Sequence, residues 1–350
     1  MISSRTHAAL DLGLVAALAG VALLPGRSPR VRWLAAGMAA AQAGTGALTD
    51  YEGGVSPRIG VQENRALDVA SAAALGGFGA AWRSPALLGA GAATLAVALL
   101  SEGRTHGGAP SMLYPPLDTP KRLAPDVWVV DSAVDPGIPV RMTVIRLEGG
   151  DLVLHSPTRH RAGLQRALEA IGPIRHLVAP NIAHWMFAKD WQDAVPGATT
   201  YGAPGLAQRG QVRRSGLRID QVLSSRAPAA WEGQIEQAVV PGHAGFHEVA
   251  MFHRASGSVL MTDLVQNFEP AKLPWVVRPL AWLMGNTTAR SRAPAYLRAL
   301  FTGRPAAAAE AARRVVGWRP DRVVVTHGRI IESGAAERLR RSLGWLTGEG

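Results

Sequence analysis

The stretch from Val239 to Leu264 constrains the fold of this chain most, because it alternates short apolar runs with tight turns. Its sequence is VVPGHAGFHEVAMFHRASGSVLMTDL. Gly242 and Gly245 flank His243, and glycines let the backbone turn sharply, so we expect this imidazole at a strand edge. Asp263 comes just after an apolar run that is typical of a buried strand.

A second histidine ends another buried strand near the C-terminus. Three consecutive valines at 323–325 are followed by Thr326, His327 and Gly328. Imidazole and carboxylate side chains at the ends of rigid strands are suitable ligands for a metal ion. The sequence therefore predicts a metal site that includes His243, Asp263 and His327.

Composition limits the classes of partner. The chain has 350 residues, which is enough for two domains, and it has no cysteine, which excludes disulfides and thiolate metal sites. The formal net charge is +11, almost all of it from arginine, and a basic face suits anionic substrates or lipid headgroups. The sequence has no basic stripe interleaved with aromatic residues, so we expect no nucleic acid partner.

The first hundred residues contain four apolar segments, at about 8–24, 32–49, 66–82 and 85–100. Each approaches the length of about 20 residues that crosses a bilayer. We therefore expect an all-α transmembrane four-helix domain over residues 1–102, with the lipid bilayer as a partner. The implied location is the bacterial inner membrane, as a multi-pass protein. The alternative is a soluble helical bundle.

The same region contains an internal duplication. The triplet Ala-Leu-Asp at 9–11 recurs at 66–68, and Arg-Ser-Pro at 27–29 recurs at 83–85. The repeated unit is therefore predicted to be a helical hairpin. Asp11 and Asp68 are either caps at the membrane interface or a proton or ion site. With the LTDYEGG sequence at 48–54, these repeats resemble small bacterial membrane domains built from SPW-type hairpins.

The pattern changes after the helices. Residues 103–124 are rich in glycine and proline, which predicts a linker. Residues 125–350 alternate predicted strands and helices, which indicates an α+β domain with a layered sheet core. Aromatic residues are frequent at 270–302, where the helices either cover the site, contact a bilayer or simply pack.

Four stretches of this second domain carry a family resemblance: PVRMTV at 139–144, LHSP at 154–157, APNIAH at 179–184 and YGAPGL at 201–206. They resemble the DUF4336 group of the metallo-β-lactamase-like superfamily. The resemblance implies an αββα sandwich with a metal site at one edge of its two sheets. It covers about residue 125 to the C-terminus.

The resemblance also implies a ligand set. His243, Asp263 and His327 match the superfamily's later metal motifs, but its HxHxDH motif is degenerate here, and of its metal-binding residues only His184 remains. The other three positions of that motif hold Ala179, Asn181 and Ala183. The resemblance therefore implies one zinc or iron(II) ion at most, held by His184, Asp263 and His327 with His243 close by.

A bound metal would activate water and polarise an ester, amide or phosphate oxygen, which implies a hydrolase acting on an unknown small-molecule substrate. Asn181 is the candidate to orient water or substrate, and His155 is a candidate base. The alternative is a catalytically inactive binding or scaffold domain that holds no metal. In a third hypothesis the helical domain binds a ligand near Asp11 and Asp68.

Overall fold

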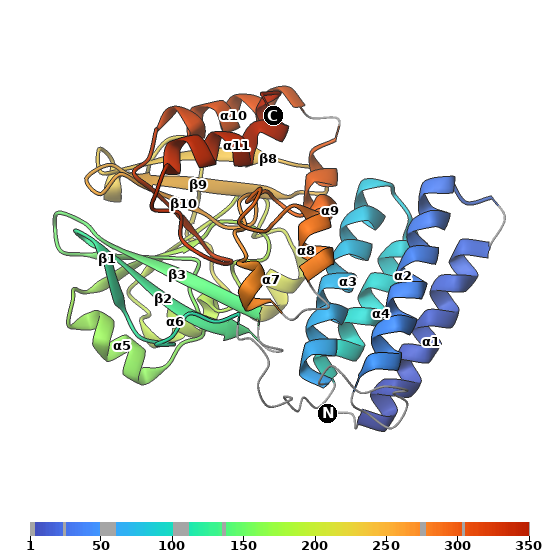
Figure 1. Ribbon diagram of the computed structural model, residues 1–350. Helices are drawn as coiled ribbons and strands as arrows, with labels where there is room; N and C mark the ends of the chain where they lie inside the picture. Colours follow the sequence, from blue (N-terminus) through green and yellow to red (C-terminus); the bar gives the residue numbers. More distant parts are fainter. Residues whose placement is uncertain are drawn as a thin grey trace.

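The computed structural model describes residues 4–23, 26–49, 61–100, 112–134, 138–273, 278–302 and 305–349. Its N-terminal part is a bundle of four helices (Figure 1), namely α1 (Ser4–Leu23), α2 (Pro29–Leu48), α3 (Val61–Ala81) and α4 (Pro85–Leu100). The repeated Arg-Ser-Pro triplet begins a helix in both copies. Ser28 caps α2 and Ser84 accepts from the Leu87 amide of α4, with proline first in each helix.

Small residues let α3 and α4 approach closely. A Cβ atom on Gly91 of α4 would lie 2.9 Å from the carbonyl oxygen of Ala72, and one on Gly79 of α3 would lie 2.8 Å from the amide nitrogen of Leu88. Leu75 and Leu87 are fully buried between the helices. The glycines therefore set the distance between these two helices.

Asp11 and Asp68 lie inside the bundle, so the interpretation of both as interfacial caps is wrong. Both carboxylates are buried, at 3% and 0% exposed. The side-chain amide of Gln42 donates to Asp68 at 2.5 Å and to Asp11 at 3.3 Å, and Asn64 donates to Asp11 at 3.3 Å. A polar network therefore joins the two copies of the repeat at the centre of the bundle.

No helix in the described part of the chain is both long enough and apolar enough to cross a membrane. The prediction of four transmembrane segments is therefore not supported. Many residues of α1 to α4 are alanine or glycine, which carry little apolar surface. In addition, polar side chains occupy the centre of the bundle.

The C-terminal part contains two sheets. The strands of the first sheet lie side by side in chain order: β1 (Lys121–Ala124), β2 (Val127–Val134), β3 (Ile138–Arg146), β4 (Leu152–His155), β5 (Ile174–Ala179), β6 (Thr199–Gly202) and β7 (Gln221–Val222). The second sheet has the order β11-β10-β9-β8, with β8 (Ile235–Pro241), β9 (His247–His253), β10 (Ser258–Met261) and β11 (Arg322–Val325). Strands β4 to β7 run parallel, and β10 runs parallel to β11.

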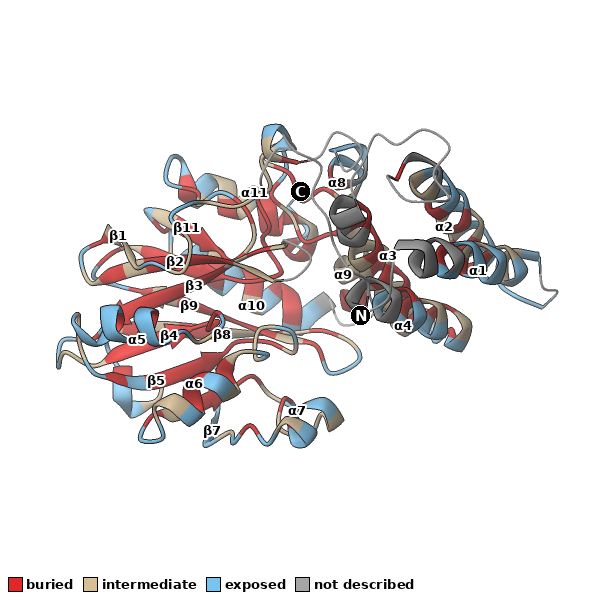
Figure 2. Ribbon diagram, turned by 90° about the horizontal axis from the view of Figure 1, so that it is seen from below, coloured by how far each residue is buried: buried red, intermediate tan, exposed pale blue. Residues whose placement is uncertain are grey.

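The two sheets pack face to face with helices on both outer sides, which confirms the predicted αββα sandwich. Val153 and Val178 of the first sheet share a buried core with Val249 and Leu260 of the second. Figure 2 shows the buried residues concentrated along these strands. The outer helices are α5 (Ala162–Glu169) and α6 (Ala188–Ala194) on one side, and α10 (Pro305–Gly317) and α11 (Ala335–Thr347) on the other.

The stretch predicted as a linker is partly structured. Strand β1 lies within it, and Leu117 forms a bridge with Asp131 of β2, while residues 101–111 lie outside the described residues. The remaining helices are α7 (Gly210–Ser215), α8 (Arg278–Met284) and α9 (Ala295–Arg298). Helix α3 packs on α9, where a Cβ on Gly77 would lie 3.0 Å from the ring of Tyr296. The bundle thus contacts the sandwich through α9 (Figure 1).

Candidate metal centre

Three predicted ligands meet at the ends of three strands. Asp263 and His327 each lie two residues beyond the parallel neighbours β10 and β11, whose last residues pair in register. His184 follows β5 of the opposite sheet. The ligand atoms of these three residues lie within 4.8 Å of one another. The carboxylate of Asp263 lies 3.4 Å from His184 Nε2 and 3.5 Å from His327 Nε2.

His327 is held by the first sheet. Its Nδ1 lies 2.8 Å from the carbonyl oxygen of Pro139 in β3. A carbonyl only accepts, so Nδ1–H donates, and Nε2 is the ring nitrogen that faces Asp263. Ordering a ligand histidine through its second nitrogen is a common feature of metal sites.

Arg141 fixes the turn that carries His327. This guanidinium is 3% exposed and donates to the carbonyl oxygens of Val325 at 2.6 Å and Gly328 at 2.8 Å. It also forms a 2.7 Å ion pair with Asp131. We did not select Arg141 from the sequence, although it lies inside the PVRMTV stretch that carries the family resemblance.

His184 is positioned from two directions. Its Nδ1 lies 2.8 Å from the hydroxyl of Ser156, which follows β4 with a positive φ of 55°. The side-chain oxygen of Asn181 accepts from the backbone amides of Ala183 at 2.8 Å and His184 at 2.9 Å. This Asx-type turn determines where the imidazole leaves the backbone.

Asp263 is ionised in this setting. Burial alone would raise the pKa of its carboxyl, but the charge and hydrogen bonding of His184, followed by those of His327, outweigh it and hold the pKa well below its usual range. Asn181 Nδ2 donates to the carboxylate at 2.7 Å. An ionised carboxylate between two imidazoles is a donor set suited to a cation, which would take the place of the protons on the rings.

Glu248 supports the loop after β10. Its carboxylate is fully buried and accepts from the backbone amides of Thr262, Asp263 and Leu264 at 2.8–3.0 Å. Burial, and then the charge of Asp263, raise the pKa of Glu248 to about 7. Sequence reasoning missed this residue, although a lone carboxylate within the apolar strand β9 was an available signal.

The donor set fits a metal ion. His184 Nε2 and His327 Nε2 lie 3.3 Å apart and both face Asp263. Two ring nitrogens at this distance need a proton or a cation between them, because two lone pairs would repel. Two imidazoles with one carboxylate suit zinc or iron(II) and leave further coordination positions open.

The structure does not bring His243 into this group. Its Nε2 donates to the carbonyl oxygen of Thr302, and its backbone amide donates to Leu300 at 2.5 Å. The turn that carries His243 does lie at a strand end, directly after β8, but it packs against residues 300–302. Among the described residues, the group of side chains that could hold a metal ion comprises His184, Asp263 and His327.

Neither predicted catalytic residue is placed to touch a substrate. Asn181 is 0% exposed, and its amide is fully engaged by Thr262, Asp263 and two backbone amides, so it positions the ligands. His155 is 1% exposed, and its Nε2 has no hydrogen-bond partner among the described residues. Burial, and then the charge of His184, lower the pKa of His155 to about 3, which makes it a poor general base.

Residues 127–326 match the sequence profile described as "Domain of unknown function (DUF4336)". The chain belongs to the DUF4336 family. The family resemblance seen in the sequence is therefore confirmed. The match does not extend to the N-terminal helices, and the resemblance of the bundle to SPW-type membrane domains is not supported.

The DUF4336 chain is also similar to solved metallo-β-lactamases. The enzyme from Hirschia baltica is 14% identical, with a TM-score of 0.44 over 65% of this chain and 96% of that one. FIM-1 from Pseudomonas aeruginosa is 14% identical, with a TM-score of 0.44 over 66% and 95% of the two chains. TMB-1 is 11% identical, with a TM-score of 0.45 over 66% and 96%. A comparison with curated proteins found no match.

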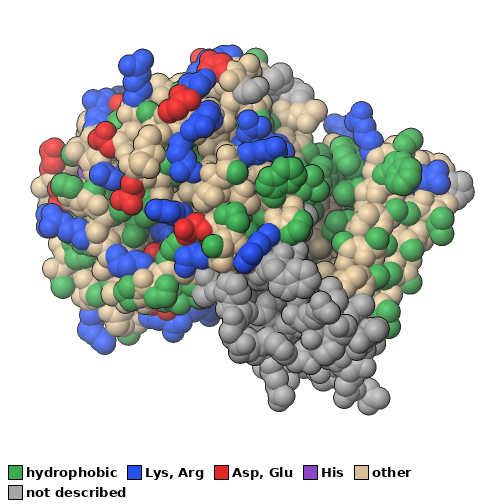
Figure 3. Space-filling view, viewed as in Figure 1, with side chains coloured by type: hydrophobic (Ala, Val, Ile, Leu, Met, Phe, Trp, Pro, Cys, Tyr) green, Lys and Arg blue, Asp and Glu red, His purple; other side chains and the backbone are tan. Residues whose placement is uncertain are grey.

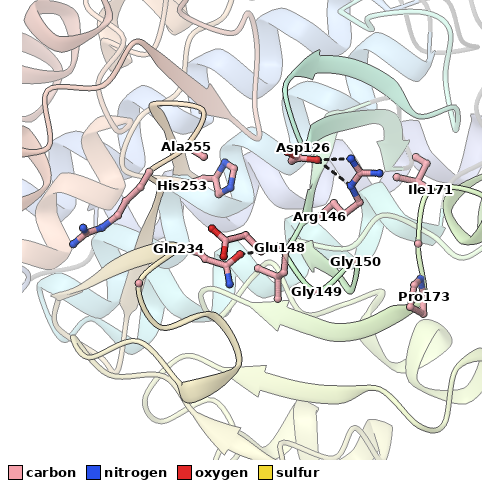
Figure 4. A pocket seen from close by; sticks show the side chains of 14 residues that line it. Asp126, Arg146, Glu148, Gly149, Gly150, Ile171, Pro173, Gln234, His253 and Ala255 are labelled. Carbon is pink, nitrogen blue, oxygen red and sulfur yellow. Dashed lines mark hydrogen bonds and ion pairs between the residues drawn. The ribbon is translucent and has the colours of Figure 1, made fainter.

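One cavity of this DUF4336 chain lies at the candidate metal site, and another lies away from it. One of about 280 Å³ includes Asp263 and His327 in its walls. A larger one, of about 890 Å³, lies among the residues shown in Figure 4. The larger cavity is lined by the residues that precede β4, β5 and β10, whereas the candidate ligands follow β5, β10 and β11. It therefore lies at the opposite edge of the sandwich, where Arg146 pairs with Asp126 at 2.6 Å.

Proposed function

We propose that His184, Asp263 and His327 bind one zinc or iron(II) ion and that the protein is a metal-dependent hydrolase. The observation that carries this proposal is the convergence of two imidazole Nε2 atoms, 3.3 Å apart, on one carboxylate. Each ligand also has a supporting partner, which is typical of metal sites: Ser156 for His184, Pro139 for His327 and Asn181 for Asp263.

A bound metal would supply an activated water and polarise the bond to be cleaved. The protein's own residues supply orientation and a dry environment. Tyr296 lines the cavity beside Asp263 and His327. Burial, and then the charge of Asp263, raise the pKa of its phenol well above the usual range, so the hydroxyl stays protonated. It is therefore available to donate a hydrogen bond to a substrate oxygen.

The test is the metal content of protein purified without added metal. We expect about one equivalent of zinc or iron in the native protein and less than about a tenth in an Asp263→Ala/His327→Ala variant. A matched control removes the same residue types from the far cavity, as Asp126→Ala/His253→Ala, and should keep the metal. The proposal would be overturned if the native protein contained as little metal as the Asp263→Ala/His327→Ala variant.

A metal-free binding or scaffold domain is the second candidate. It is favoured by the alanines at 179 and 183, which stand where the superfamily motif carries ligands. In that case a proton on His184 or His327 would occupy the position between the two rings. The elemental analysis above decides between the two candidates.

Association with the lipid bilayer of the bacterial inner membrane stays a prediction. Fractionation of cells that produce the full chain would test it. Recovery in the membrane pellet after an alkaline wash is the expected result for a bilayer protein, and recovery in the supernatant would remove the prediction.

A further inference from the structure

The cavity beside the candidate metal site has one wall from each half of the molecule. The helical bundle supplies Leu34 and Met38 from α2, with Val69 and Phe78 from α3. The sandwich side supplies further apolar side chains, namely Ile138, Phe268, Leu273 and Met284. Figure 3 shows hydrophobic side chains on both sides of the hollow between the bundle and the rest of the molecule.

The arrangement of the bundle keeps this space open. Helix α3 packs chiefly on α4, and α1 packs on α2 and α4, while α2 and α3 contact each other only slightly. Several of the side chains that face the cavity from α2 and α3 are small, including Ala41, Ala70 and Ala73. A cleft between α2 and α3 therefore faces the sandwich.

The polar groups of the cavity are concentrated at the candidate metal site. Gln266 donates to Asp263 at 3.4 Å, and Asn286 donates to Gln266 at 3.0 Å, so these side chains form one connected group with His327. Asn286 Oδ1 has no hydrogen-bond partner among the described residues, so it is an available acceptor. The rest of the wall is almost wholly apolar.

We propose that the ligand of this cavity is a single-chain amphiphile, such as a fatty acyl ester or amide. Its hydrocarbon chain lies between α2 and α3, and its carbonyl group lies near Asp263, His327 and Tyr296. At about 280 Å³ the cavity is near the lower end of the range for small-molecule sites, which suits one acyl chain rather than a two-chain lipid.

The reaction assigned to this ligand rests on the proposed function. In hydrolysis of the ester, the hydroxyl of water adds to the acyl carbon, the carbon–oxygen bond to the alcohol breaks, and the alcohol leaves with the proton. The products are a fatty acid and an alcohol. Binding of the chain by the bundle does not depend on that reaction.

Binding is tested with cis-parinaric acid, a fatty acid whose fluorescence rises in an apolar site, titrated into the full chain. We expect one saturable site in the native protein. Ala73→Phe and Ala70→Phe each fill the cavity and should weaken binding by about tenfold or more. Ala92→Phe places the same ring on an exposed position of α4 and should leave binding unchanged. Circular dichroism verifies that each variant is folded.

The possible outcomes distinguish a failure of the ligand proposal from a failure of the metal proposal. Binding of the probe to both the native protein and the metal-poor Asp263→Ala/His327→Ala variant supports the cavity and is independent of catalysis. A native protein that holds metal but does not bind the probe overturns the ligand proposal alone. Equal affinity in native, Ala73→Phe and Ala70→Phe proteins, with both variants folded, also overturns it, because the probe then binds elsewhere.

Discussion

The Nδ1 atom of His327 lies 2.8 Å from the carbonyl oxygen of Pro139, so a candidate ligand at the end of one sheet is oriented by the second residue of a strand in the other. Two residues along that strand, Arg141 binds the carbonyl oxygens on either side of His327, from Val325 and Gly328. The geometry of the site therefore depends on how the two sheets are packed together.

Replacing Arg141 by methionine should cost about 3–5 kcal/mol in the free energy of unfolding, because two buried carbonyls lose their donor and the buried Asp131 keeps, among the described residues, only Lys121 as a cationic partner. Urea denaturation measures this loss. Arg146→Met on the same strand removes an exposed ion pair with Asp126 and should cost less than about 1 kcal/mol. Equal losses in the two variants would contradict the role given to Arg141.

Gly328 should not tolerate a side chain. It has a φ of +96°, and a Cβ atom there would lie 2.2 Å from the carbonyl oxygen of Asn267. Gly328→Ala should therefore lower the free energy of unfolding by at least about 2 kcal/mol, from the strained φ and the clash together. Gly205→Ala, with a φ of +79° and nothing within 4 Å, should lose only about 1 kcal/mol. Similar thermal midpoints for both variants would argue against a close approach at Gly328.

Asn181 should affect metal affinity without being a ligand. Asn181→Ala releases both the carboxylate of Asp263 and the turn that carries His184, so we expect a loss of about 10–100-fold in affinity, measured by competition with a chelator. Gln192 is another buried amide, bonded to Thr200 and to the carbonyl of Arg218 away from the site. Gln192→Ala should destabilise the fold but keep the native metal affinity. If Gln192→Ala lost as much metal affinity as Asn181→Ala, the loss in both variants would be a result of unfolding.

His155 should make the protein sensitive to acid. Its pKa is about 6.5 when unfolded and is lowered to about 3 in the folded protein, mainly by burial. Between these values only the unfolded chain binds the proton, so stability from this group is present above about pH 6.5 and falls as the pH is lowered. At about pH 5 the loss is about 2 kcal/mol. His155→Leu should flatten the dependence of the unfolding free energy on pH between about 7 and 5. If the unfolding free energy of His155→Leu depended on pH as steeply as that of the native protein, other groups would be responsible for the acid sensitivity.

The sandwich was predictable because its signals are local. Apolar runs ended by Gly, His or Asp predict buried strands with polar residues at their ends, and this places Asp263 and His327 at one edge without coordinates. His243 was also correctly placed at a turn. Its contact with Thr302 depends on a segment 59 residues away, which no local pattern reveals.

The helical bundle could not be assigned to a membrane or to a protein interior by hydropathy, because both surroundings favour apolar helices. The contacts that bury the polar groups of the bundle are long-range. Gln42 reaches Asp11 and Asp68 across 31 and 26 residues, which turns two isolated acids in the sequence into one internal network. The roles of Arg141 and Glu248 are also long-range, since Arg141 binds carbonyls of β11 and the turn after it, and Glu248 binds amides of the loop after β10.

Close packing in the bundle gives a further test. A side chain on Gly91 would meet the backbone of Ala72 and Gly76 at 2.9 Å, so Gly91→Ala should cost about 1–3 kcal/mol by forcing α3 and α4 apart. Gly89→Ala lies on the open side of the same helix and should gain up to about 1 kcal/mol from helix propensity. Thermal denaturation of the two variants should therefore shift in opposite directions, and a shared direction would contradict the packing described for α4.

In the proposed function, the shared cavity would place the chemistry on one half of the molecule and the selectivity on the other. The candidate metal ligands all come from the sandwich, whereas much of the surface that would contact a ligand's tail comes from α2 and α3, near the start of the chain. If the proposed ligand is right, replacing the N-terminal helices with those of a relative would redirect binding toward tails of another length or shape, while the candidate metal ligands stayed in place.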